Sequence, residues 1–366
     1  MYSIYKERRI SLVNELNRSS IDYSFITDPA NIFYYTGFLT NPHERFLSLF
    51  VNVQKNEFVL FVPALDEDAA SQFSDLHPII PISDEEIPFE VIQNKVGTIE
   101  GKVGIEGTQF SYRLIVQCQK YFSRISFVDI QEIVNEQRLI KSTNEVVAIK
   151  KAITIIENVL EDGMKYIREG MTEIELTAEL EYLMRRHGAD APSFSTIVLA
   201  GENAALPHGS PGQRKIEQGD VVLIDFGVIK DGYCSDITRT FAVKYASNEV
   251  RDIYNVVLES NEQAIQTVKA DVPLKTFDIA ARNVIHQAGF GQYFNNRVGH
   301  GLGIEVHEAP SIHQQNNALA KSGMVFTIEP GIYIPEEVGI RIEDCLYVTK
   351  EGAVPFTHTS KDYTEV

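Results

Sequence analysis

The residues Val221-Val-Leu-Ile-Asp-Phe-Gly-Val-Ile-Lys-Asp-Gly-Tyr-Cys-Ser-Asp-Ile-Thr238 decide the fold of the second half of this chain. Their first four residues form an apolar run, which predicts a buried strand that leads into Asp225. Asp231-Gly232 is a tight-turn signal, because this pair readily adopts the positive φ angles of a hairpin turn. A hairpin would place Asp225 and Asp236 on neighbouring strands, where cross-strand side chains lie within about 5–8 Å. The stretch therefore predicts two carboxylates held side by side.

A second pair of acidic residues repeats this arrangement near the C-terminus. Glu329 lies in Thr327-Ile-Glu-Pro-Gly331 and Glu343 lies in Arg341-Ile-Glu-Asp344, with residues 335–339 as the turn between them. Side chains alternate between the two faces of a strand, so Arg341 and Glu343 are expected to share a face. Two hairpins are thus predicted to present four carboxylates from strands and strand ends.

His300 supplies a nitrogen donor from a glycine-rich segment, Gly299-His-Gly-Leu-Gly303. Glycine allows the backbone to approach a metal closely. Carboxylates are rarely buried unless they are paired or bind a metal, and Arg341 is the one obvious charge partner beside this set. We therefore expect two divalent cations, which would activate water for hydrolysis, bound by Asp225, Asp236, His300, Glu329 and Glu343. Oxygen-rich ligation favours Mn²⁺, with Co²⁺ or Zn²⁺ as alternatives.

Composition restricts the class of protein and its partners. The chain has 366 residues, of which 44% are hydrophobic and 23% charged, as in ordinary globular proteins long enough for two domains. Its formal charge of −18 would repel phosphate backbones and anionic membranes, so neither nucleic acid nor membrane is an expected partner. No apolar run approaches the ~18 residues of a membrane span, and the first residues lack the apolar stretch of a signal peptide. The three cysteines imply no disulfide framework, and a cytoplasmic protein is expected.

The chain changes character near residues 131–142. The preceding residues alternate helical and strand patterns, which predicts a small α/β domain over residues 1–134. The second domain, residues 135–366, opens on the capping box Ser142-Thr-Asn-Glu145 and a long amphipathic helix to about residue 167. Further helices are predicted over residues 172–188, 249–268 and 276–289, with strands near the C-terminus.

Several motifs together carry a resemblance to a known family. They are Leu206-Pro-His208, Asp225-Phe-Gly, Asp236-Ile-Thr-Arg-Thr, His300-Gly-Leu-Gly with His307-Glu, Glu329-Pro-Gly and Arg341-Ile-Glu343. Over about residues 138–360 the chain resembles the pita-bread metallopeptidases, and within them the proline-specific prolidases and aminopeptidases P. The segments beginning at Asn31 and Pro42 resemble the creatinase-like N-terminal domain of bacterial prolidases. This resemblance implies an α+β fold, with a small α/β N-terminal domain followed by a catalytic domain of curved antiparallel sheet covered by helices.

The resemblance also implies a role for each ligand. Asp225 would hold one cation, and His300 with Glu329 would hold the other. Asp236 and Glu343 would bridge the two cations. Glu329 would in addition act as the general base that takes a proton from the bridging water.

Four further residues receive roles from the same resemblance. His208 and His307 would hydrogen-bond the substrate carbonyl and stabilise the tetrahedral intermediate, as an oxyanion hole does. Arg341 would orient Glu343. Tyr333 either lines the proline pocket or packs in the core.

The implied activity is that of a metal-dependent Xaa-Pro dipeptidase, or prolidase, acting on short proline-containing peptides as a homodimer. Some prolidases have His-Glu-x-Pro-Arg where this chain reads His307-Glu-Ala-Pro-Ser311, so an arginine anchor for a dipeptide carboxylate is missing. We expect His43 or Arg45, from the N-terminal domain of a partner subunit, to replace it, although their loop reads equally as an exposed polar loop. The missing arginine keeps open an Xaa-Pro aminopeptidase that acts on longer peptides. A metal-free creatinase or a non-catalytic binding protein would have lost ligands.

Overall fold

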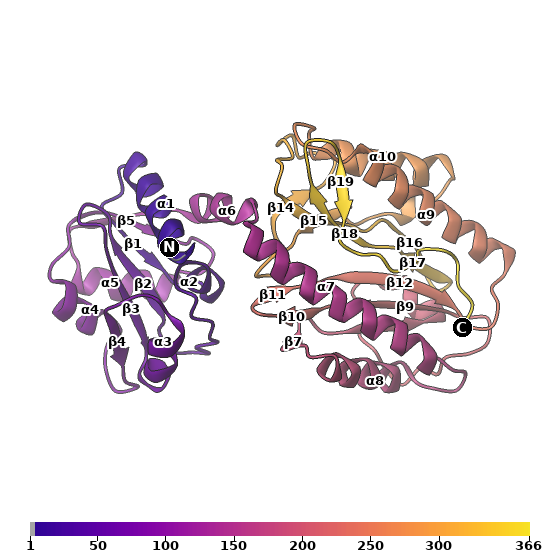
Figure 1. Cartoon of the computed structure of the whole chain (residues 1–366), viewed down its shortest axis with the longest axis horizontal. Coiled ribbons are helices and arrows are strands. Elements are labelled where there is room, and N and C mark those ends of the chain that lie inside the picture. Colours follow the sequence, from indigo (N-terminus) through magenta and orange to yellow (C-terminus); the bar gives the residue numbers. More distant parts are fainter. Residues whose placement is uncertain (1–3) are drawn as a thin grey trace. The chain divides into compact units, whose positions relative to one another are not determined.

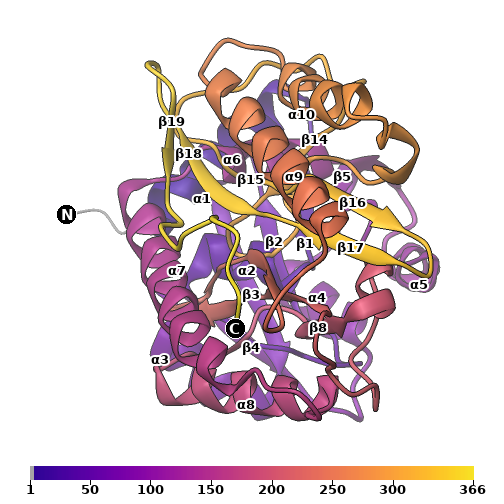
Figure 2. The ribbon, with the colours of Figure 1, turned by 90° about the vertical axis from the view of Figure 1, so that its right-hand side faces the viewer.

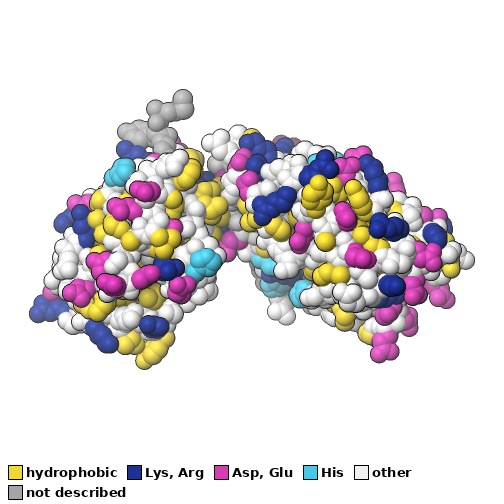
Figure 3. Space-filling view, turned by 90° about the horizontal axis from the view of Figure 1, so that it is seen from below, with side chains coloured by type: hydrophobic (Ala, Val, Ile, Leu, Met, Phe, Trp, Pro, Cys, Tyr) yellow, Lys and Arg dark blue, Asp and Glu magenta, His cyan; other side chains and the backbone are white. Residues whose placement is uncertain are grey.

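The computed structural model describes residues 4–366, which form two compact units, one ending at Arg138 and the other running from Leu139 to Val366 (Figure 1). Among the helices of these residues, none has both the length and the apolar composition needed to cross a bilayer. On the face drawn in Figure 3, acidic side chains are spread over both units and interspersed with Lys and Arg. The excess negative charge is therefore dispersed on that face.

The first unit is built on one mixed six-stranded sheet in the order β4-β3-β2-β1-β5-β6. Its strands are β1 (Tyr23–Ile26), β2 (Ser48–Asn52), β3 (Glu57–Pro63), β4 (Ile79–Ile82), β5 (Gly101–Ile105) and β6 (Ile125–Asp129). Its helices are α1 (Ile4–Arg18), α2 (Pro29–Thr36), α3 (Glu67–Phe73), α4 (Pro88–Val96), α5 (Tyr112–Tyr121) and α6 (Gln131–Leu139). The expected α/β unit is confirmed, and Asn56 adopts a positive φ of 52° in the turn between β2 and β3.

Four long helices of the second unit begin close to the predicted positions. They are α7 (Thr143–Gly163), α8 (Glu173–Arg186), α9 (Asn248–Thr267) and α10 (Lys275–Gln287). Ser142 and Glu145 form the expected capping box at the start of α7, and Thr172 and Glu175 form another at the start of α8. These reciprocal bonds satisfy backbone N–H groups that the first turn of a helix leaves without a partner.

The sheets of the second unit are antiparallel in every strand pair that the structure describes there. One sheet has the order β12-β9-β8, a second β14-β13-β15-β18-β19, and two smaller ones are β16-β17 and β11-β10-β7. The strands are β7 (Ala191–Pro192), β8 (Ile197–Ala200), β9 (Val221–Phe226), β10 (Val228–Lys230), β11 (Tyr233–Cys234), β12 (Ile237–Ala242), β13 (Gly299–Gly301), β14 (Glu308–Ile312), β15 (Val325–Ile328), β16 (Gly331–Ile334), β17 (Val338–Arg341), β18 (Asp344–Val348) and β19 (Ala353–Pro355).

Two hydrophobic cores lie on opposite faces of strand β9. Val222 and Ile224 pack with residues of α7 and α8, whereas Val221 and Leu223 pack with residues of α9 and α10. This alternation follows from the two-residue period of a strand, and it points Asp225 toward the side of α9 and α10. In Figure 2 the two helix pairs lie on either side of the strands of this unit. The predicted α+β architecture is confirmed.

Candidate metal centre

The first predicted hairpin is present. Asp231 and Gly232 have φ angles of 52° and 79°, and the strands on either side of them, β10 and β11, pair antiparallel. Further along the same two chain segments, β9 pairs with β12 in a register that sets Thr238 opposite Asp225. Asp236 lies directly before β12, so the hairpin brings the two aspartates to one end of a strand pair.

The second hairpin is formed by β16 and β17, with Glu336 at a positive φ of 63° in the turn. Gly331 pairs with Arg341 at the open end of this ladder. Glu329 lies just before the first paired residue, and Glu343 lies just after the last. The two glutamates therefore leave the open end of the hairpin together, as the sequence predicts.

His300 lies on strand β13, with its ring against carboxylates of both hairpins. Its Nε2 atom is 3.3 Å from Glu329 Oε1 and 3.6 Å from Asp236 Oδ2. One donor atom each from Asp236, His300 and Glu343 lie within 4.8 Å of one another, and all three residues are buried. Gly299 is required beside His300, because a Cβ there would lie 1.9 Å from the carbonyl oxygen of Thr327.

Three buried carboxylate oxygens in this cluster have no hydrogen-bond partner among the described residues. They are Asp225 Oδ1, Asp236 Oδ1 and Glu343 Oε1. Buried polar atoms in native proteins are nearly always paired, and an unpaired carboxylate oxygen is especially costly. Carboxylate oxygens together with an imidazole are suitable ligands for Mn²⁺ and for borderline divalent cations. The residues present therefore fit a metal centre.

The carboxylates also disfavour one another's charge. Burial, followed by repulsion from Glu343 and Asp225, raises the pKa of Asp236 well above its ordinary value. Burial and then repulsion from Glu329 and Asp225 do the same to the pKa of Glu343. Burial opposes ionisation of Glu329, but the hydrogen bond and charge of His300, together with the charges of Arg341 and Arg297, hold that pKa below the ordinary value. Bound cations would relieve the repulsion among these groups.

Arg341 holds the aspartate side of the cluster. Its NH2 group donates to Asp225 Oδ2 at 2.5 Å, its NH1 group donates to the hydroxyl of Tyr333 at 2.7 Å, and its Nε donates to Thr238 Oγ1 at 3.1 Å. Thr238 in turn donates to Glu343 Oε2 at 2.7 Å. Arg341 therefore contacts Asp225 directly and reaches Glu343, the residue it was expected to orient, through Thr238.

One pocket of about 700 Å³ in the second unit is lined by all nine residues predicted there, the five candidate ligands with His208, His307, Tyr333 and Arg341. The ring of His307 lies edge-on to that of His300, with ring centres 4.1 Å apart. Loss of water around the ring, and then the neighbouring His300 and Arg297, lower the pKa of His307 to about 4. His307 is therefore neutral near pH 7, and one ring nitrogen carries the N–H that a hydrogen bond to substrate needs.

Arg297 also lines this pocket, and the sequence reasoning missed it. Its NH1 group donates to Ser311 Oγ at 3.2 Å, so a guanidinium group lies beside the position where some prolidases carry their arginine. The sequence contained no signal for it, because a position three residues before His300 does not share a strand face with it. Thr238 was missed as well, although its place two residues after Asp236 in an extended segment suggests a shared face.

His43 and Arg45 lie in the first unit, in a loop that lines a different pocket of about 690 Å³ within that unit. Arg45 donates to both carboxylate oxygens of Asp84, through Nε at 2.8 Å and NH2 at 3.1 Å. His43 adopts a positive φ of 54°. These two residues lie in a well-defined loop of the first unit. Their expected role in substrate binding stays a prediction.

Comparison with known proteins matches each of the two units to a protein family. Residues 147–350 match the model of metallopeptidase family M24, and residues 8–140 match that of the creatinase/prolidase N-terminal domain. A Bacillus subtilis protein named, provisionally, as a dipeptidase is 43% identical over 342 residues, which are 93% of this chain and 94% of that protein.

Two solved structures are similar over almost the whole chain. An Xaa-Pro dipeptidase from Bacillus anthracis has a TM-score of 0.91 at 32% identity, over 99% of this chain and 100% of that one. An X-Pro aminopeptidase from Thermotoga maritima has a TM-score of 0.89 at 32% identity, over 98% of this chain and 99% of that one.

Proposed function

Because this chain belongs to metallopeptidase family M24, we propose that it hydrolyses the Xaa–Pro bond of dipeptides at a centre of two divalent cations. The single observation that carries the proposal is the set of three buried carboxylate oxygens without a partner among the described residues, whose residues line one pocket with His300. Creatinase-like chemistry without metal, or a binding protein on this fold, would leave these unpaired oxygens without an explanation.

In this proposal the chain holds each cation with its own residues. Asp225 would hold one, His300 and Glu329 would hold the other, and Asp236 and Glu343 would serve both. Cations bound in this way would lower the pKa of a bridging water and polarise the scissile carbonyl. Mn²⁺ is the proposed cation, because the ligands are four carboxylates and one imidazole with no thiolate.

Side chains of the pocket would take up the proton and stabilise the negative charge that develops during the reaction. Glu329 has 17% of its side chain exposed, so it can take a proton from water at the pocket wall. His208 and His307 are proposed to donate to the oxygen of the scissile carbonyl as negative charge develops there. These donors matter because the nitrogen of an Xaa–Pro bond carries no N–H for the site to hold.

Arg297 supports a dipeptide substrate. Its guanidinium lies in the pocket beside Ser311, and guanidinium groups bind carboxylates through two parallel hydrogen bonds. We propose that Arg297 binds the C-terminal carboxylate of the dipeptide. The alternative, an Xaa-Pro aminopeptidase acting on longer peptides, is favoured by Ser311, which leaves this position without its own arginine. Rates on Ala-Pro and on Ala-Pro-Ala separate the two, since a dipeptidase cleaves the first far faster than the second.

Replacement of Arg297 by methionine is expected to raise KM for Ala-Pro by about 10- to 100-fold, because a charge-assisted hydrogen bond contributes roughly 1.5–3 kcal/mol. The kcat value should change little, since the bond is made before and during the reaction. Steady-state kinetics on Ala-Pro and on its C-terminal amide provide the check. The unmodified enzyme should prefer the free carboxylate and the Arg297→Met variant should not, and an unchanged preference would contradict the assignment.

We also propose that the enzyme is a homodimer in which His43 and Arg45 act as substrate contacts of the neighbouring subunit. Both residues lie in a polar loop, and their side chains offer an imidazole and a guanidinium for binding a peptide. The change Arg45→Ala should raise KM for Ala-Pro several-fold while leaving metal binding intact, and sedimentation velocity should give twice the chain mass. Unchanged KM and kcat in this variant would remove the loop from the proposal.

A further inference from the structure

Asn261 is a buried amide of helix α9 whose NH₂ group and carbonyl oxygen are both hydrogen-bonded. It has no exposed surface, and its Nδ2 group donates to the carbonyl oxygens of Ile328 at 3.0 Å and Ile342 at 3.3 Å. Its Oδ1 atom accepts from Lys361 Nζ at 2.8 Å. An ammonium group can only donate, so Lys361 requires the amide oxygen to face it and the NH₂ group to face the carbonyls.

The two carbonyls stand at matching places in the candidate centre. Ile328 directly precedes Glu329 and Ile342 directly precedes Glu343. Ile328 ends strand β15, and Ile342 follows strand β17 of a different sheet. Asn261 therefore ties together the two chain segments that present the glutamates, one peptide unit away from each glutamate.

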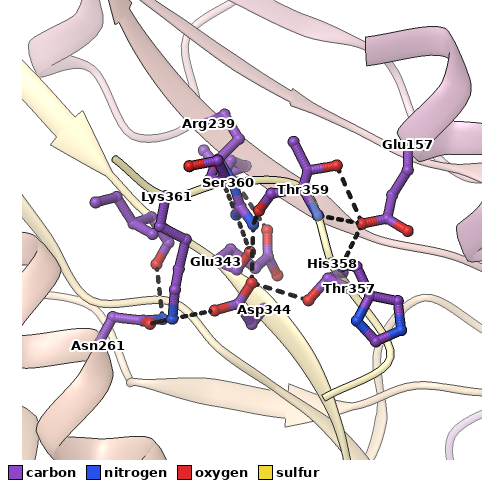
Figure 4. Close-up of polar contacts among 12 residues, drawn as sticks. Glu157, Arg239, Asn261, Glu343, Asp344, Thr357, His358, Thr359, Ser360 and Lys361 are labelled. Carbon is purple, nitrogen blue, oxygen red and sulfur yellow. Dashed lines mark hydrogen bonds and ion pairs between the residues drawn. The ribbon is translucent and has the colours of Figure 1, made fainter. Parts of the chain in front are cut away.

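A buried ionic network behind the centre holds Lys361 in turn (Figure 4). Lys361 Nζ lies 2.9 Å from Asp344 Oδ2, while Asp344 Oδ1 accepts from Arg239 at 2.9 Å and from Thr357 at 2.8 Å. Arg239 also donates to the carbonyl oxygen of Glu343 at 2.5 Å. The peptide groups before and after Glu343 are thus both fixed, one by Asn261 and the other by Arg239.

Thr238 of strand β12 fixes the backbone N–H and one carboxylate oxygen of Glu343. Its backbone N–H donates to the carbonyl oxygen of Thr238 at 3.2 Å, and its Oε2 atom accepts from the hydroxyl of the same residue. One carboxylate oxygen, Oε1, is left without a partner among the described residues. The chain around Glu343 is therefore held on all sides except the one that would face a cation.

We propose that Asn261 is a positioning residue of the metal centre, which sets the separation of Glu329 and Glu343 by holding the peptide groups before them. Lys361 fixes the amide in the required orientation. Metal ligands must be held to within about 0.5 Å for full affinity, and this precision comes from the groups behind the ligands. This inference rests on the proposed function, because it needs the two glutamates to be ligands.

The test is titration of the metal-free full chain with MnCl₂ by calorimetry, for the unmodified chain and for Asn261→Ala. The variant should bind Mn²⁺ about 10- to 100-fold more weakly, the usual cost of losing a group that supports a ligand. At saturating Mn²⁺, kcat on Ala-Pro should fall while KM stays unchanged. Both readouts report on the metal centre rather than on overall stability.

Ser260 offers a matched control on the same helix. It is equally buried, and its hydroxyl donates to the carbonyl oxygen of Ala281 on α10 at 2.9 Å, away from the centre. Ser260→Ala should lose a similar amount of stability in the metal-free state and keep the Mn²⁺ affinity of the unmodified chain. Equal losses of affinity in the two variants, or no loss in Asn261→Ala, would overturn the inference.

A second variant covers the case in which Asn261→Ala does not fold. Lys361 is 23% exposed at its side chain, so Lys361→Met is expected to fold and to lower Mn²⁺ affinity in the same direction by a smaller factor. Unchanged affinity in that variant would count against the inference. An unmodified chain that binds no Mn²⁺ would instead overturn the proposed function, and the two failures are therefore distinguishable.

Discussion

Replacement of Asp236 by alanine is expected to lower kcat/KM for Ala-Pro by about 10³-fold or more, because several kcal/mol of transition-state stabilisation depend on the metal centre. Asp236 is buried, lies 3.6 Å from His300 and has one oxygen without a partner among the described residues. Its removal deletes one of the two ligands that both cations are proposed to share. Steady-state assays with Mn²⁺ in excess measure the loss.

Thermal unfolding of the same variant separates metal binding from folding. Without metal, Asp236→Ala should be at least as stable as the unmodified chain, because burial and the charges of Glu343 and Asp225 disfavour the ionised Asp236. Added Mn²⁺ should stabilise the unmodified chain, since a ligand that binds the folded state shifts its unfolding, and should do much less for the variant. Asp252→Ala, an exposed aspartate of α9, is the control and should leave activity and Mn²⁺ stabilisation unchanged. Normal prolyl cleavage by Asp236→Ala would contradict the proposed centre.

The change Glu329→Gln is expected to lower kcat by about 10²- to 10⁴-fold, the usual contribution of a general base. Glutamine keeps the shape of the side chain and one carbonyl oxygen as a donor to metal, but it cannot take a proton from water. KM for Ala-Pro should change little, because the proposed substrate contacts of Arg297, His208 and His307 remain. Single-turnover rates with Mn²⁺ at saturation measure the chemical step without product release.

Glu337→Gln is the matched control for this second variant. Glu337 is exposed in the turn of the same hairpin, so the change removes an identical charge without touching the pocket. It should behave as the unmodified enzyme. A Glu329→Gln variant with the kcat of the unmodified enzyme would exclude Glu329 as the general base, whatever its part in metal binding.

Local signals in the sequence predicted the parts of the centre that are formed within one hairpin or one strand. Asp231-Gly232 can adopt positive φ angles, so the hairpin that joins Asp225 to Asp236 was readable from residue types alone. The alternation of Val221 to Ile224 between two cores also follows from the strand period. These features are fixed within about twenty residues of sequence and need no knowledge of the packing of distant segments.

Contacts between distant segments could not be read in this way. The family resemblance implied that Arg341 orients Glu343, and the strand period placed the two on one face, whereas the guanidinium of Arg341 bonds directly to Asp225 on strand β9. The strand period states which face a side chain occupies, but not which residue of another strand meets it there. Asn261 gave no signal, since its position on α9 acquires meaning only when that helix packs over the ends of β15 and β17.

Anomalous diffraction at the manganese absorption edge, from crystals soaked in MnCl₂, tests the central claim most directly. Two Mn²⁺ peaks are expected roughly 3.5–4 Å apart, with Asp236 and Glu343 between them and His300 beside one. Peaks elsewhere on the chain, or none among these side chains at saturating Mn²⁺, would contradict it.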